Sequence, residues 1–146
     1  MKRRLVFGAT LAVAALAAIA TPFAAGGGYG GQQSVSVILR EYGISSPSLK
    51  LAVFGKESPL KPGRTTFTIR NAGKFLHNFT IINTSPGGTK FKTPDIAPGK
   101  SATLPVNLKP GSYIAICTVF NGFHAAAGMV KSFSVGTIDE KGNWGG

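Results

Sequence analysis

Four side chains that can bind soft or borderline metal ions lie in the second half of the sequence. Cys117, His124 and Met129 fall within thirteen residues, with six residues between the first two and four between the last two. His77 lies forty residues upstream of the cysteine. A thiolate, two imidazoles and a thioether are the donors of a trigonal copper site with a weak axial methionine. These four residues therefore predict one copper ion that cycles between Cu(II) and Cu(I).

Each of these residues alone has an ordinary structural explanation. A single cysteine is commonly a small buried apolar residue, and a methionine often fills a gap in a core. A lone histidine is more often an ordinary core or surface residue than a ligand. The combination favours the metal site, because the chain has one Cys, two His and, besides Met1, one Met.

The first 25 residues resemble an export segment. Lys2, Arg3 and Arg4 precede a largely apolar run over residues 5–20, and small residues follow. This order predicts a signal peptide, and we favour cleavage near Ala25. An uncleaved N-terminal membrane anchor stays open. Either way the chain is expected to be exported, to the periplasm or the outer face of the cytoplasmic membrane, where a free thiol needs protection.

The rest of the 146 residues has room for one domain. A glycine-rich linker is expected over residues 26–33, the domain over 34–136 and a frayed tail over 137–146. Apolar residues alternate with polar ones in short runs, which is typical of strands with one buried face. Pro-Gly pairs between the runs indicate turns. We expect an all-β fold, an antiparallel Greek-key β-sandwich of about seven or eight strands. The alternating apolar residues are Val35, Val37, Leu39, Phe67, Ile69, Ala102, Leu104, Val106 and Leu108.

The predicted strands place the four candidate ligands at one end of the sandwich. Residues 113–117 form a strand that is apolar on both faces and ends at Cys117. A turn then carries His124, and Met129 begins the next strand. His77 starts another strand. One loop thus delivers three ligands, and a neighbouring strand delivers the fourth.

Over residues 34–136 the sequence resembles the plastocyanin/azurin-like cupredoxins. The resemblance rests on four short motifs taken together and in order: Arg70-Asn71-Ala72-Gly73, His77-Asn78-Phe79, Gly111-Ser112-Tyr113, and His124 followed by Gly128-Met129-Val130. It implies a type 1 blue-copper site. The loop between Cys117 and His124 is longer than in plastocyanins or azurins. Leu76 stands where azurins have a glycine that supplies an extra carbonyl ligand, so we expect four ligands.

The resemblance also implies roles around the site. Asn78 would tie the two ligand loops together and hydrogen-bond near the cysteine sulfur. His124 would be the partly exposed ligand through which electrons pass. An apolar docking patch would surround it, formed by Gly122, Phe123, Ala125, Ala126 and Ala127.

Several functions fit such a domain. We expect a monomeric electron carrier rather than an enzyme, because further copper centres need more histidines or a second cysteine. Copper storage or delivery is an alternative, although carriers usually offer clusters of methionine or histidine. A metal-free sandwich would follow if copper did not bind.

Charge suggests the kind of partner. The formal net charge is +11, and +8 without Lys2, Arg3 and Arg4. A basic surface favours redox partners with acidic surfaces, such as a cytochrome or a copper or haem oxidoreductase. Nucleic acid is not expected, because the basic residues are scattered singly. Contact with a membrane is expected only through an uncleaved anchor.

Overall fold

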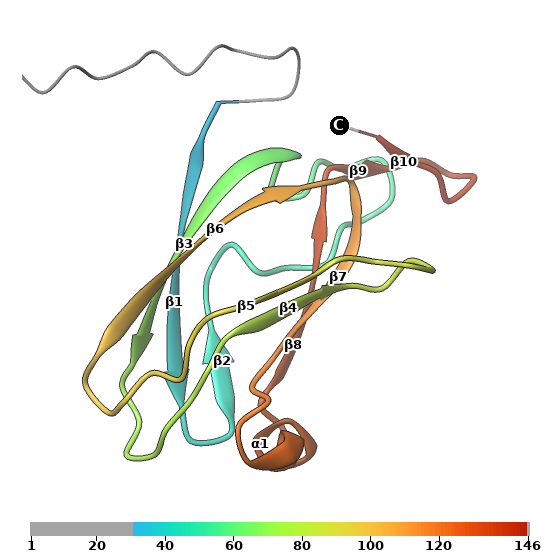
Figure 1. Cartoon of the computed structure of the whole chain (residues 1–146). Coiled ribbons are helices and arrows are strands. Elements are labelled where there is room, and N and C mark those ends of the chain that lie inside the picture. Colours follow the sequence, from blue (N-terminus) through green and yellow to red (C-terminus); the bar gives the residue numbers. More distant parts are fainter. Residues whose placement is uncertain (1–30, 146) are drawn as a thin grey trace, which may run out of the picture.

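The computed structural model describes residues 31–145, and the expected export segment lies outside this range. Two four-stranded sheets pack face to face as a sandwich (Figure 1). The first sheet has the order β2 (Gly43–Ser45), β1 (Gln33–Arg40), β3 (Gly63–Asn71) and β6 (Ser101–Leu108). The second has the order β5 (Lys90–Lys92), β4 (Thr80–Asn83), β7 (Gly111–Ile116) and β8 (Val130–Val135). Within residues 31–145, no helix is long and apolar enough to cross a membrane.

The strands of the first sheet follow the alternation in the sequence. Val35, Val37 and Leu39 of β1 are at most 2% exposed, while the residues between them face solvent. This is the period of two that places one face of a strand on the core. Pro105 lies within β6, where its missing N–H is tolerated because β6 is an edge strand. The sandwich prediction is therefore confirmed at the level of fold and layers.

One strand pair differs from the antiparallel prediction. β1 and β3 run parallel, with Val35 opposite Phe67, whereas the other strand pairs of both sheets are antiparallel. The cause is the connection between β2 and β3. Residues 46–62 leave the first sheet and run beside the second, where Ser58 N–H donates to Gly136 O at 3.1 Å. The chain then returns to the end where β1 began, since Gln33 Nε2 donates to Lys61 O.

Aromatic side chains fill the space between the sheets. Phe67 and Phe79 meet with ring centroids 5.5 Å apart, and Tyr113 stacks on Phe133 at 5.3 Å. All four are at most 2% exposed. The Tyr113 hydroxyl donates to Lys109 O at 2.9 Å, so the one polar atom of this ring is paired.

Residues 137–145 form a hairpin, where the sequence suggested a frayed end. β9 (Thr137–Ile138) pairs with β10 (Trp144–Gly145) as an antiparallel hairpin. The Asp139 carboxylate closes its turn by accepting the backbone N–H of Lys141 and of Asn143, at 2.9 and 2.8 Å. An aspartate that accepts backbone N–H groups two and more residues ahead is a common turn-forming device. Periodicity over so short a segment could not reveal it.

Replacing Phe67 tests the packing between the sheets. Phe67→Ala should lower the free energy of unfolding by about 3–5 kcal/mol, because it removes a fully buried ring and leaves a cavity. Urea unfolding followed by circular dichroism measures the change. The matched control is Phe54→Ala, whose ring is 66% exposed and whose loss should change stability by no more than about 0.5 kcal/mol. Equal effects of the two substitutions would contradict this description of the core.

Candidate metal centre

Three of the predicted ligands converge at one end of the sandwich. Nδ1 of His77 lies 3.1 Å from Nδ1 of His124, and Cys117 Sγ lies 3.8 and 3.6 Å from these two nitrogens. His77, Cys117 and His124 are 1%, 0% and 5% exposed. Within the part of the chain that the structure describes, this is the one group of three or more His, Cys, Asp or Glu side chains placed to hold a metal ion.

The separations of the three donor atoms fit a single ion. Bonds from a first-row metal ion are about 2.0–2.1 Å to an imidazole nitrogen and about 2.3 Å to a thiolate, as measured for zinc. A nitrogen and a sulfur atom that bind one ion therefore lie no more than about 4.4 Å apart, and two nitrogen atoms no more than about 4.2 Å. All three distances are below these limits. A thiolate with two imidazoles favours copper among the common metals, so the cluster is consistent with one type 1 copper ion.

Met129 is fixed next to the cluster through its backbone. Its carbonyl accepts the N–H of Cys117 at 3.2 Å, and its own N–H donates to His124 O at 2.9 Å. The residue is fully buried. Because both neighbours supply converging donor atoms, Met129 stays the predicted fourth ligand.

The loop between Cys117 and His124 contains two short helices instead of a simple turn. A 3₁₀ turn, η1 (Phe120–Gly122), leads directly into α1 (Phe123–Ala126), which carries His124. Phe120, Asn121 and Gly122 are left-handed in succession, with φ of 53°, 54° and 83°. Glycine adopts this conformation without strain and asparagine tolerates it, so Phe120 is the residue that must be held there by its contacts.

Aromatic rings cover His124, which corrects the expectation that this ligand is partly exposed. The rings of Phe120, Tyr42 and Phe123 lie against it, with centroid distances of 5.4, 6.2 and 6.2 Å. The imidazole is consequently 95% buried. Phe120 and Phe123 come from the segment after Cys117, whereas Tyr42 comes from the turn between β1 and β2.

The residues of the expected docking patch do surround this histidine. Phe123 is 60% exposed, Ala126 and Ala127 are exposed, and Gly122 and Ala125 are half-buried. We call these five residues the apolar patch. Phe120, which is 63% exposed, extends it. The structure thus leaves an apolar surface over the cluster, and its use for docking remains a proposal.

Asn78 links the two segments that carry the ligands. Its Oδ1 accepts hydrogen bonds from the backbone N–H and the hydroxyl of Thr118, at 2.8 and 3.1 Å. Its backbone N–H donates to Cys117 Sγ at 3.4 Å. Its Nδ2 donates to Asp95 at 2.9 Å, which adds a third segment. Such contacts orient a ligand and tune the metal that it binds. Sequence reasoning missed Asp95, because nothing in the local sequence marks it.

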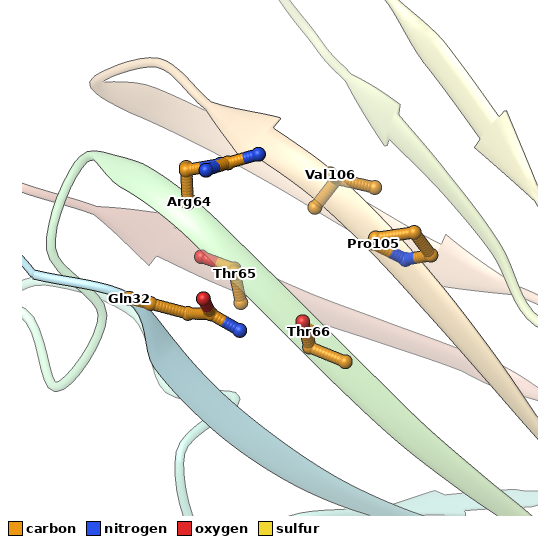
Figure 2. A pocket seen from close by; sticks show the side chains of 6 residues that line it. All are labelled: Gln32, Arg64, Thr65, Thr66, Pro105 and Val106. Carbon is orange, nitrogen blue, oxygen red and sulfur yellow. The ribbon is translucent and has the colours of Figure 1, made fainter. Parts of the chain in front are cut away.

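The structure also contains a shallow hollow on a different surface (Figure 2). It has a volume of about 130 Å³ and lies over the start of β1, the start of β3 and the second half of β6. None of the predicted site residues lines it. The residues that do are Gln32, Arg64, Thr65, Thr66, Pro105 and Val106.

Comparison with known proteins gives structural matches only. No protein-family model matches the chain, and no curated protein does. Auracyanin B matches with a TM-score of 0.54 and 19% identity, over 70% of this chain and 88% of that chain. Reduced auracyanin from the photosynthetic bacterium Roseiflexus castenholzii matches with 0.50 and 19%, over 74% and 98%. A blue copper oxidase from Nitrosomonas europaea matches with 0.48 and 16%, over 72% and 39%.

The two auracyanin matches agree with the arrangement of the two sheets. The first two cover most of both chains, so they show the same fold over a whole domain. The chain has the cupredoxin fold. At this level of identity the likeness establishes fold alone, so the chemistry has to be argued from the buried cluster.

The metal-free protein should lose stability in mild acid. Burial lowers the pKa of His77 below its usual value, and the neighbouring His124 lowers it further. The unfolded chain therefore binds a proton near pH 6.5 that the folded chain resists. The free energy of unfolding is therefore highest above that pH. It decreases as the pH falls from about 6.5 towards the lower pKa of His77 in the folded state.

Urea midpoints at pH 7.5 and pH 5.0 measure this dependence. The midpoint should fall at pH 5.0, and it should fall less in His77→Gln, which has no titrating group at this position. The same change with pH in both proteins would show that His77 is not its source.

Proposed function

We propose that this cupredoxin-fold chain carries single electrons between redox partners outside the cytoplasm, and that His77, Cys117, His124 and Met129 hold one copper ion. The observation that carries the proposal is the convergence of two imidazole nitrogens and a thiol in a buried cluster. Copper bound there would supply the Cu(II)/Cu(I) couple. The lone cysteine would be protected as a ligand.

The chain's own residues prepare the site. Cys117 directly follows β7, and Met129 directly precedes β8, so two paired strands fix the ends of the loop. His77 bridges to Ile96 by two backbone hydrogen bonds, of 3.2 and 2.7 Å. A frame held in this way resists rearrangement when the charge at the centre changes, which favours rapid electron transfer. The buried position excludes water from the donor atoms.

The apolar patch is the proposed contact with partners. It lies on α1 and its flanks, so it places exposed apolar residues directly beside His124. Exposed basic residues lie at the same end of the sandwich, among them Arg40 at the end of β1 and Lys74 after β3. An apolar centre with charges around it is typical of interfaces that form and separate quickly. We infer partners with acidic surfaces.

The residue inventory argues against the other functions. Storage or delivery would be served by spare methionines or histidines, and the chain has only two histidines, both in the cluster. The same count argues against catalysis by this chain alone, because a second copper centre would need imidazoles that it lacks. Electron transfer uses every soft ligand that the chain has.

Addition of copper tests the central claim. One equivalent of Cu(II) added to the purified metal-free protein should produce an intense visible charge-transfer band and a narrow copper hyperfine splitting in EPR. Both arise from a thiolate–copper bond, so both should be absent in Cys117→Ser. A pale solution with ordinary copper EPR would show that the cluster does not form a type 1 centre, and the proposal would fail.

Steering by charge is a separate prediction. Stopped-flow electron exchange with an acidic cytochrome should slow as ionic strength rises from 10 mM to 500 mM, because the Debye length falls from about 30 Å to a few Å. A rate that does not change with salt would contradict a partner with an acidic surface.

Two variants with the same new charge locate the contact. Ala126→Asp lies in the apolar patch and should slow the exchange even at high salt, because it places a charge in the dry centre of the interface. Thr103→Asp, on the exposed face of β6, should leave the high-salt rate unchanged. The visible spectrum should be the same in both, which shows that the centre itself is intact.

A further inference from the structure

The turn between β1 and β2 is a third segment of the site. Glu41 and Tyr42 form this turn, which lies at the same end of the sandwich as α1 (Figure 1). Tyr42 presents its ring edge-on to His124, with an interplanar angle of 88°. Glu41 lies by the other histidine, His77. The turn therefore lies beside both imidazoles, although its sequence contains no recognisable motif.

The Glu41 carboxylate is held in place by the chain that leads to His77. Its Oε1 accepts the backbone N–H of Lys74 and of Phe75, the latter at 3.3 Å. These hydrogen bonds, that of Lys74 first, lower the pKa of Glu41 below its usual value. The carboxylate is therefore ionised at neutral pH and oriented by two donors.

His77 has one ring nitrogen that nothing satisfies. Its Nδ1 faces Cys117 and His124, whereas its Nε2 is buried and has no hydrogen-bond partner among residues 31–145. Buried polar atoms without a partner are rare in folded proteins. If Nδ1 binds the metal, Nε2 carries the proton and needs an acceptor.

Gly73 makes room for that acceptor. A Cβ on this residue would lie 2.6 Å from Glu41 Oε1 and 2.9 Å from His77 Nε2. Both atoms therefore lie next to the space that a side chain at position 73 would fill. A side chain at this position would crowd both the carboxylate and the imidazole.

We propose that Glu41 is a positioning residue for the copper ligand His77 and that it accepts the Nε2–H of His77 when copper occupies Nδ1. The carboxylate would fix the tautomer that leaves Nδ1 free to bind and would add a negative charge beside the centre. Metal-binding histidines usually donate their other N–H to a carboxylate or a carbonyl in this way. The inference rests on the proposed function, because it requires copper to bind at Nδ1.

The reduction potential of the copper-loaded full chain tests the charge. Glu41→Gln keeps an oxygen acceptor but removes the negative charge. A negative charge near the copper stabilises Cu(II) more than Cu(I). At a fixed solution potential the Cu(II)/Cu(I) ratio should therefore fall at least about threefold, as Coulomb's law gives for a charge several ångströms away. The matched control is Glu140→Gln in the exposed C-terminal hairpin, which should leave the ratio unchanged.

Proton NMR of the diamagnetic Cu(I) form tests the hydrogen bond itself. The wild-type protein should show a slowly exchanging, downfield His77 Nε2–H signal. The signal should be lost or move upfield in Glu41→Ala, where no acceptor remains, and Glu41→Gln should partly restore it. A residue that merely held the loop would change stability but would move neither this signal nor the potential.

The outcomes separate the two proposals. If the wild type forms a type 1 centre while Glu41→Gln matches Glu140→Gln in potential and in the His77 signal, the role of Glu41 is refuted and electron transfer stands. If the wild type forms no such centre, both fail. Should Glu41→Gln not fold, Glu41→Ala provides the same test, because it also removes the carboxylate charge and should shift the ratio in the same direction.

Discussion

The structure depends on keeping three polar donor groups together and away from water. Two imidazoles and a thiol are more than nine-tenths buried within 3.8 Å of one another. Such groups do not cluster in a core for the sake of stability, because burial without partners is unfavourable. The sandwich holds them by the backbone: β7 and β8 fix both ends of the loop that follows Cys117, and the bridge to Ile96 fixes His77. The packing of the two sheets thus offsets the unfavourable burial of these groups, which a bound metal ion would pair.

Hydrogen bonds between loops make this end of the molecule one unit. Asn78 bonds to Thr118, to Asp95 and to the sulfur of Cys117, and so joins three segments that are distant in sequence. Asn71, the last residue of β3, also links separate segments, because its Nδ2 donates to the carbonyls of Phe75 and Ile96 at 2.8 Å each. Buried polar networks in which every member is paired give rigidity. The positions of the three donor groups are therefore fixed by hydrogen bonds among all of these loops, and no single loop fixes them alone.

The sequence predicted the sandwich and its converging donors because both depend on strong local signals. Alternation marks strands such as β1, and Cys117, His124 and Met129 lie close together in the chain. The parallel pairing of β1 with β3 was missed, because it depends on where residues 46–62 travel in space. Asp95 and Glu41 were missed for the same reason. Each is an ordinary acidic residue until the fold brings it to Asn78 or His77, and no periodicity encodes that contact.

Two residues with positive φ angles place the rings that bury His124. Tyr42 and Phe120 are two of the three non-glycine residues with positive φ among residues 31–145, and both place a ring against this histidine. Each such conformation costs on the order of 1–3 kcal/mol. Both rings remain half or more exposed, so burial of their own surface does not fully offset this cost. At Tyr42 the positive φ is also what a two-residue hairpin loop requires at its second residue, since Arg40 pairs with Gly43. The same backbone conformation thus closes the turn and places a ring against His124.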